Sequence, residues 1–148
     1  LAVKNMEKAK AFYKSVLGLE VVMDAGANVE LTGGIFLQTT DTWVDFIHWS
    51  SSDIIFKNNA IELYFETDDM DAFMINIEKF SNITYIHPLI THSWGQRAVR
   101  FYDLDNHIVE VAENIAMVIR RFIASGFTVE ETARCMDVPA EWIQSALE

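Results

Sequence analysis

The chain has 148 residues, a formal net charge of −11 and an apolar fraction of 51%. This length and composition suffice for one domain with a buried core plus a small appendage, and they argue against disorder. The acidic excess argues against binding to nucleic acid or to an anionic membrane, because both need clustered Lys and Arg, and no apolar run is long enough to cross a bilayer.

Cys135 is the only cysteine, so the chain cannot form an internal disulfide. This suits a reducing compartment, and we expect a cytoplasmic protein. We recognise no signal peptide, phosphate loop or dinucleotide-binding fingerprint. Because no His or Lys is placed to activate Cys135, we expect it to be a small buried residue on a helix.

The first part of the chain predicts one strand, one helix and three more strands. Residues 1–3 read as the end of a strand. Residues 6–17 carry apolar side chains at spacings of three and four, which predicts a helix that Gly18 ends. Glycine turns separate the next strands, expected at 19–23, 28–31 and 34–39. The aromatic segment 43–52 fits either a loop or a short helix.

The following part repeats this order. It predicts a strand at 60–67, a helix at 68–79 with acidic residues in its first turn, a strand at 84–87 and a loop at 88–95. Met70 stands in the second helix where Met6 stands in the first, which indicates an internal repeat. Helices that feed antiparallel strands lie on one face of each sheet, so the fold class is α+β.

The last part predicts three helices. Residues 113–125 are amphipathic, Thr128 and Glu131 form a capping box for a second helix, and Pro139 begins a third. The order resembles a helix-turn-helix. However, the last helix carries no Lys or Arg, which a recognition helix needs, so we expect these helices to pack on the body or on a partner subunit.

A β-hairpin at residues 97–111 precedes these helices. Polar and apolar side chains alternate over 97–102, and Asp-Leu-Asp-Asn at 103–106 predicts a turn. The second strand carries Glu110 among apolar residues. A carboxylate there must be solvated, paired or bound to a metal, because burying a bare charge is very costly.

This hairpin resembles the last two strands of the vicinal oxygen chelate superfamily, which includes glyoxalases, bleomycin-resistance proteins and extradiol dioxygenases. Their pattern is an aromatic residue, an Asp-Pro-Asp-Gly-Asn-like turn, an apolar pair and a Glu. Here Leu104 replaces the Pro, and Asn106-His107 replaces the Gly. Residues 1–19, with Phe12-Tyr13 and Leu17-Gly18, resemble the superfamily's opening strand, helix and Phe-Tyr…Leu-Gly motif.

The resemblance implies a domain over residues 1–113 and a C-terminal three-helix extension over residues 114–148. Two βαβββ modules, about residues 1–40 and 60–112, would form a curved mixed sheet around a shared cavity. The resemblance also implies a small-molecule ligand and a homodimer.

The superfamily's metal-ligand positions map onto Gln38, Glu62 and Glu110, with a fourth falling three residues before Leu1. Glu62 stands where metal-binding members commonly have His. Oxygen ligands suit Mg²⁺, Mn²⁺ or Fe²⁺. The resemblance also leaves Ni²⁺, Zn²⁺ or no metal at all as alternatives.

Without a metal, two carboxylates that share a cavity would repel each other, and one would take up a proton. A cationic ligand, Arg97 or Arg100 would relieve this repulsion. Alternatively, Glu62 and Glu110 both point into water. The strand register decides, because a slip of one residue exchanges the two faces.

Candidate substrate-binding residues are aromatic, basic or imidazole side chains. Residues 92–96 resemble the loop that closes over substrate in this superfamily, and an aromatic lid can exclude water and stack on a flat ligand. None of the four His has the spacing of a zinc motif. The candidates are Trp43, Trp49, His92, Trp94, Arg100 and Tyr102. Packing between subunits is the alternative for the aromatic ones.

Three functions follow from these residues and this resemblance. The first is a divalent-metal-dependent enzyme of lyase, isomerase or dioxygenase type, with the ion as Lewis acid and Glu110 as general base. The second is a metal-free protein of the bleomycin-resistance type that sequesters a flat or cationic compound. The third is a structural or regulatory dimer.

Overall fold

The structure is a computed structural model that describes all residues, 1–148. The chain folds into two compact units, each built from two segments. The first unit contains residues 1–61 and 102–108, and the second contains residues 62–101 and 109–148. No helix is both long enough and apolar enough to span a membrane.

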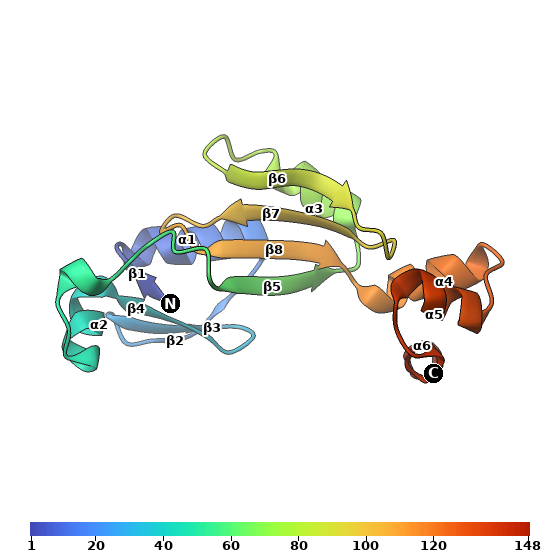
Figure 1. Cartoon of the computed structure of the whole chain (residues 1–148). Coiled ribbons are helices and arrows are strands. Elements are labelled where there is room, and N and C mark those ends of the chain that lie inside the picture. Colours follow the sequence, from blue (N-terminus) through green and yellow to red (C-terminus); the bar gives the residue numbers. More distant parts are fainter. The chain divides into compact units, whose positions relative to one another are not determined.

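The first module follows the predicted order of elements (Figure 1). Its strands form one mixed sheet in the order β1-β4-β3-β2, in which β1 is parallel to β4 and the other pairs are antiparallel. The elements are β1 (Ala2–Val3), α1 (Met6–Leu17), β2 (Val21–Asp24), β3 (Asn28–Leu31) and β4 (Ile35–Thr39). The aromatic segment that follows begins with a short helix, α2 (Thr40–Ile47), and then forms a 3₁₀ turn, Ser51–Asp53.

The second module has the same topology, with the strand order β5-β8-β7-β6. Figure 1 shows β5 and β8 running in one direction and β7 in the opposite direction. The elements are β5 (Glu62–Thr67), α3 (Met70–Ile77), β6 (Thr84–Thr91), β7 (Arg97–Tyr102) and β8 (Ile108–Glu113). The predicted α+β class and the two βαβββ modules are therefore confirmed.

The internal repeat extends to the helix starts. Met6 and Met70 are both buried first residues of their helices. The N-cap side chains of Asn5 and Asp69 each accept a hydrogen bond from the backbone N–H three residues further on. These caps satisfy N–H groups that the first helical turn leaves without partners.

Strand β6 corrects part of one prediction, because it continues over residues 88–91 of the expected loop, whereas residues 92–95 do form a loop. Pro88 lies inside this strand although proline cannot donate a ladder hydrogen bond. The sheet order explains why this is tolerated, since β6 is an edge strand and has a neighbour on one side only.

One face of the second sheet packs against α3. Phe101 of β7 is fully buried, stacks on Phe73 of α3 at 6.4 Å between ring centroids, and contacts the Tyr85 ring at 6.5 Å. Val99 and Val109 are also fully buried. Because side chains alternate along a strand, Arg100, between Val99 and Phe101, and Glu110, next to Val109, lie on the opposite, open face.

Three C-terminal helices follow β8 in the second unit: α4 (Ile115–Ala124), α5 (Val129–Met136) and α6 (Ala140–Leu147). They share a core of Val118, Ile119, Ala133, Met136 and Ile143. The predicted capping box is confirmed, with a bond from the Glu131 N–H to the Thr128 hydroxyl at 3.1 Å and one from the Thr128 N–H to the Glu131 carboxylate at 2.8 Å.

The expectation that Cys135 is buried is wrong, because its side chain is exposed. The buried residues of α5 are Thr132, Ala133 and Met136. Cys135 lies at the edge of this buried stripe, beside Thr132 and Met136, and its side chain points away from the helical core.

The Asp103 carboxylate organises the turn between β7 and β8 in the first unit. It accepts hydrogen bonds from the Tyr13 hydroxyl at 2.7 Å and from His107 Nδ1 at 2.8 Å. It also accepts from the backbone N–H groups of Asp105 at 2.9 Å and His107 at 2.8 Å. Burial opposes ionisation, yet the bonds from His107 and Tyr13 hold the pKa of Asp103 below its usual range.

We expect Asp103→Ala to lower the free energy of unfolding by about 3 kcal/mol, because several buried donors lose their acceptor. Tyr13→Phe removes one of these bonds and should cost about 1 kcal/mol. The lowered pKa stabilises the fold above about pH 4, and this contribution is lost as the pH falls through the native pKa. Urea unfolding near neutral pH and near pH 3 measures both effects. An Asp103→Ala variant with the same pH dependence as the wild type would contradict the assignment.

Candidate functional site

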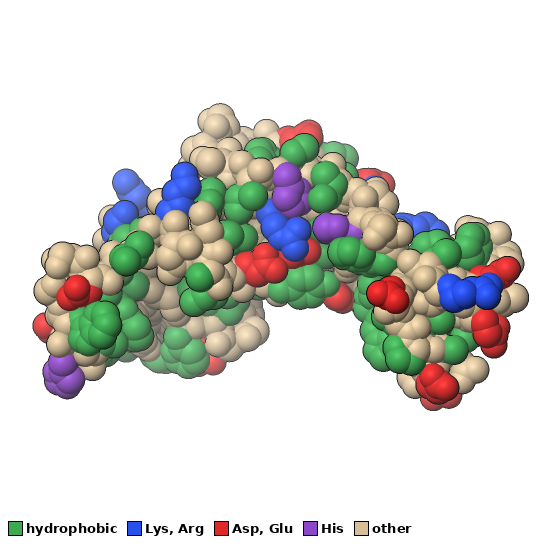
Figure 2. Space-filling view, in the orientation of Figure 1, with side chains coloured by type: hydrophobic (Ala, Val, Ile, Leu, Met, Phe, Trp, Pro, Cys, Tyr) green, Lys and Arg blue, Asp and Glu red, His purple; other side chains and the backbone are tan.

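Four polar side chains, each from a different strand, meet on the open face of the second sheet. These are Glu62 on β5, Glu110 on β8, Arg100 on β7 and His87 on β6. Figure 2 shows acidic, basic and histidine side chains gathered over these strands. The strand order brings together residues that are far apart in the sequence, and we call this set the polar row.

Arg100 bonds to every other member of the polar row. Its Nε donates to Glu62 Oε2 at 3.1 Å, its Nη2 donates to Glu110 Oε2, and its Nη1 lies 3.2 Å from His87 Nε2. A guanidinium has no acceptor, so His87 Nε2 must accept from it. His87 Nδ1 then donates to the Pro88 carbonyl at 2.7 Å, which fixes the neutral tautomer.

The two carboxylates of the polar row differ in their environments. The Glu62 side chain is 39% exposed, whereas that of Glu110 is 6% exposed. Burial raises the pKa of the Glu110 carboxyl, the Arg100 guanidinium acts against this, and the neighbouring Glu62 carboxylate adds to the rise. A carboxyl with a raised pKa, beside a second carboxyl, is a candidate for proton exchange.

The segment between β6 and β7, residues 92–96, adjoins the polar row. His92 and Trp94 stack in parallel, with ring centroids 4.1 Å apart. Trp94 Nε1 donates to the Gln96 side chain at 3.0 Å, and Gln96 Nε2 donates to the Tyr64 hydroxyl at 3.1 Å. Tyr64 lies on β5, two residues after Glu62. The loop is therefore fastened to the strand that bears the exposed carboxylate.

His92 is the loop residue with unused hydrogen-bonding capacity. Its Nε2 is buried and has no hydrogen-bond partner. Burial lowers the pKa of His92, and the Arg100 charge lowers it further, which favours the neutral ring near pH 7. A buried polar atom without a partner can be satisfied by a ligand.

Several residues predicted for the site come together in the second unit. Glu62, Glu110 and Arg100 form the polar row with His87, and His92 and Trp94 stack in the adjoining loop. The prediction that Arg100 can relieve the repulsion between the carboxylates matches these contacts. Arg97 instead pairs with Asp71 and Glu113.

The other predicted residues belong to the first unit. The buried Gln38 amide accepts from Asn28 Nδ2 at 2.7 Å and donates to the Thr42 hydroxyl. The Tyr102 hydroxyl donates to Asn59 Oδ1 at 2.7 Å. Trp43 and Trp49 are exposed. Their part in a ligand site stays a prediction.

Sequence reasoning missed three residues of this face: Tyr64, His87 and Gln96. His87 falls on a predicted strand, so its presence in the sheet could be expected. Its contact with Arg100 could not, because Arg100 lies on a different strand and the pairing of the two strands was unknown. The Trp94–Gln96–Tyr64 contacts depend on how a loop folds back over β5, for which the sequence pattern gives no signal.

The donor set does not fit a resident divalent ion as it is arranged. No group of three or more His, Cys, Asp or Glu side chains is placed to hold a metal. Glu62 and Glu110 both accept from Arg100, so an ion between them would meet a fixed positive charge. The predicted third ligand, Gln38, already uses its side-chain oxygen on Asn28.

Two βαβββ modules of identical topology define a glyoxalase-like fold. Residues 1–116 match the family model described as the glyoxalase-like domain. The chain therefore belongs to this family, and the resemblance to the vicinal oxygen chelate superfamily is confirmed. No match was found among curated proteins.

Solved structures support the same assignment. The chain is similar to a protein of unknown function from Agrobacterium tumefaciens str. C58, with 32% identity, a TM-score of 0.66 and coverage of 76% of this chain and 87% of that one. It is also similar to a lactoylglutathione lyase from Agrobacterium tumefaciens, with 25% identity, a TM-score of 0.55 and coverage of 77% and 89%. A glyoxalase/bleomycin resistance protein/dioxygenase family enzyme from Burkholderia phytofirmans PsJN, at 12% identity, TM-score 0.66 and coverage of 76% and 93%, shares the fold.

Arg100→Gln tests the electrostatics of the polar row. At neutral pH it should lower the free energy of unfolding by about 2–3 kcal/mol, because Glu62 and Glu110 then face each other without a cation. Urea unfolding measures this cost, and adding Glu110→Gln should recover much of it by removing the repulsion. Arg120→Gln, at an exposed arginine of α4, is the matched control. If Arg100→Gln and Arg120→Gln lower the free energy of unfolding equally, the proposed role of Arg100 between the two carboxylates is wrong.

Proposed function

We propose that this glyoxalase-like protein binds a small molecule on the open face of its second sheet without a resident metal, as bleomycin-resistance proteins do. One observation carries the proposal: Arg100 pairs with both carboxylates at the positions where the superfamily holds its metal. The positive charge between these acids thus belongs to the protein. The groups left for a ligand are acceptors and ring faces.

A flat compound with a cationic group is the ligand class that these groups favour. Arg100 pairs with Glu62 Oε2, and the Glu62 side chain is exposed enough for a cationic group to approach it. Tyr64 and Trp94 are partly exposed and offer aromatic faces, which attract flat rings and positive charge. The net charge of −11 also favours a cation over an anion.

The second candidate is a metal-dependent enzyme of lyase, isomerase or dioxygenase type. The raised pKa of Glu110 beside Glu62 favours proton transfer, and one similar structure is that of a lactoylglutathione lyase. In this alternative the two glutamates would hold an ion that polarises a substrate oxygen. Arg100 would first have to withdraw from both carboxylates.

Ligand binding can be tested with two probes of similar size and opposite charge, N-methylquinolinium and quinoline-2-carboxylate. In calorimetry with EDTA present, we expect the cation to bind more tightly. Glu62→Gln should weaken cation binding about tenfold, because a contact between opposite charges becomes a neutral one. Glu141→Gln, at an exposed acid of α6, should leave it unchanged. Preference for the anion, or loss of binding in EDTA, would reject the proposal.

Metal binding separates the two candidates. We expect the wild type to show no Mn²⁺ affinity that depends on Glu110. Arg100→Gln should bind Mn²⁺ at least about tenfold more tightly, since removing the fixed cation frees two oxygen ligands. Adding Glu110→Gln should abolish the gain. Titration followed by electron paramagnetic resonance measures Mn²⁺ binding in each variant. If the wild type binds Mn²⁺ tightly and Glu110→Gln removes this binding, the metal-dependent enzyme is favoured.

A further inference from the structure

The C-terminal helices lie almost entirely outside the family match, which ends at residue 116. They are nevertheless joined to the loop of the candidate site by specific contacts within the second unit. Glu113, at the end of β8, makes the first of these. Its side chain accepts from Arg121 Nη1 at 2.8 Å and from Arg121 Nη2 at 3.1 Å.

Glu113 also holds the start of β7. Its carboxylate accepts from the Arg97 backbone N–H at 3.0 Å and from Arg97 Nε at 2.9 Å. Burial opposes ionisation, but the bonds from Arg121 and Arg97 lower the pKa of Glu113 to about 2. The acid is thus a permanent anion at neutral pH that ties α4 to β7 and β8.

The tip of the 92–96 loop rests directly on α4. Arg121 Nη2 donates to the Gly95 carbonyl at 2.6 Å. Gly95 has a φ of +85°, and a Cβ atom added there would lie 2.6 Å and 2.7 Å from two ring carbons of Phe122. Position 95 therefore needs glycine both for its backbone conformation and for the approach of the Phe122 ring.

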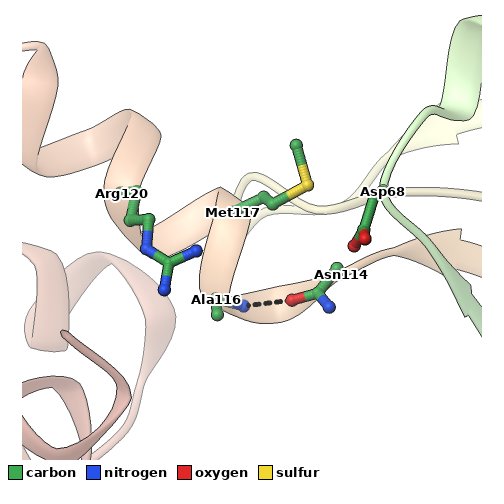
Figure 3. Close-up of a pocket in the computed structure, with 5 residues that line it drawn as sticks. All are labelled: Asp68, Asn114, Ala116, Met117 and Arg120. Atoms are coloured by element: carbon green, nitrogen blue, oxygen red, sulfur yellow. Dashed lines mark hydrogen bonds between the residues drawn. The ribbon is translucent and has the colours of Figure 1, made fainter. Parts of the chain in front are cut away.

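Not every residue of α4 is packed this closely. Met117 and Arg120 border an open hollow of about 520 Å³, together with Asp68, Asn114 and Ala116 (Figure 3). The contacts that reach the 92–96 loop come from Arg121 and Phe122. Movement of these two side chains would therefore displace Gly95.

Gly95 lies between the two loop residues that complete the candidate site. Trp94 stacks on His92, and Gln96 donates to the Glu113 carbonyl at 2.8 Å and to Tyr64. We propose that α4, through Arg121 and Phe122, is a positioning element that sets the His92–Trp94 pair over the polar row. The C-terminal extension then tunes ligand affinity, an inference that rests on the proposed function.

The test uses the full chain with Phe122→Ala and Gly95→Ala. The parallel Trp94 ring should shift the His92 proton resonances upfield in the wild type, and both variants should move them downfield as the stack loosens. This NMR readout needs no ligand. The affinity for N-methylquinolinium should fall about tenfold in each variant, because the loop must then be ordered on binding. Phe122→Leu should recover part of both effects.

Ile143→Ala is the matched control, because Ile143 is fully buried in the helical core and is not one of the loop contacts. It should lower the melting temperature of the helices while leaving the His92 resonances in place. If Ile143→Ala shifts them as much as Phe122→Ala, or if neither loop variant shifts them, the positioning role is wrong. If the resonances shift as expected but the wild type does not bind the probe, the positioning role stands and the proposed function fails.

Discussion

The pairing of one guanidinium with two carboxylates sets the electrostatics of the open face of the second sheet. Strand β8 lies between β5 and β7 in the sheet, so Glu110 is flanked by Glu62 on one side and Arg100 on the other. Without Arg100 the two acids would repel each other, and the buried Glu110 carboxylate would be left without a compensating charge. Arginine is suited to the position because its donors point in several directions and it stays protonated.

Glu110 and Glu113 show how neighbouring charges set the properties of similar side chains. Both lie on β8 and both are largely buried. Glu113 has two arginine partners and a lowered pKa, whereas Glu110 shares one arginine with another acid and has a raised pKa. The first suits a permanent structural anion, and the second suits a group that gains and loses protons.

Local chemistry in the sequence predicts much of this fold. The matched Met6 and Met70, the glycine after α1 and the Asp-rich turn before β8 each act within a few residues, and their elements form as expected. Which strands pair with each other cannot be predicted from such local signals. Pro88 reads as a loop residue until β6 is known to be an edge strand, and His87 gains its role only beside Arg100. The exposure of Cys135 depends on which side of α5 faces the helical core.

Membership of the glyoxalase-like family gives the fold, but the chemistry depends on the side chains that the fold brings together. An ion held by two acids can polarise a substrate oxygen, because it keeps coordination positions open. A guanidinium already bonded to Glu62, Glu110 and His87 has less capacity for this. Its fixed charge instead holds the two acids and the histidine in place. Glu62 thereby becomes an oriented acceptor, which is what a binding site needs from a carboxylate.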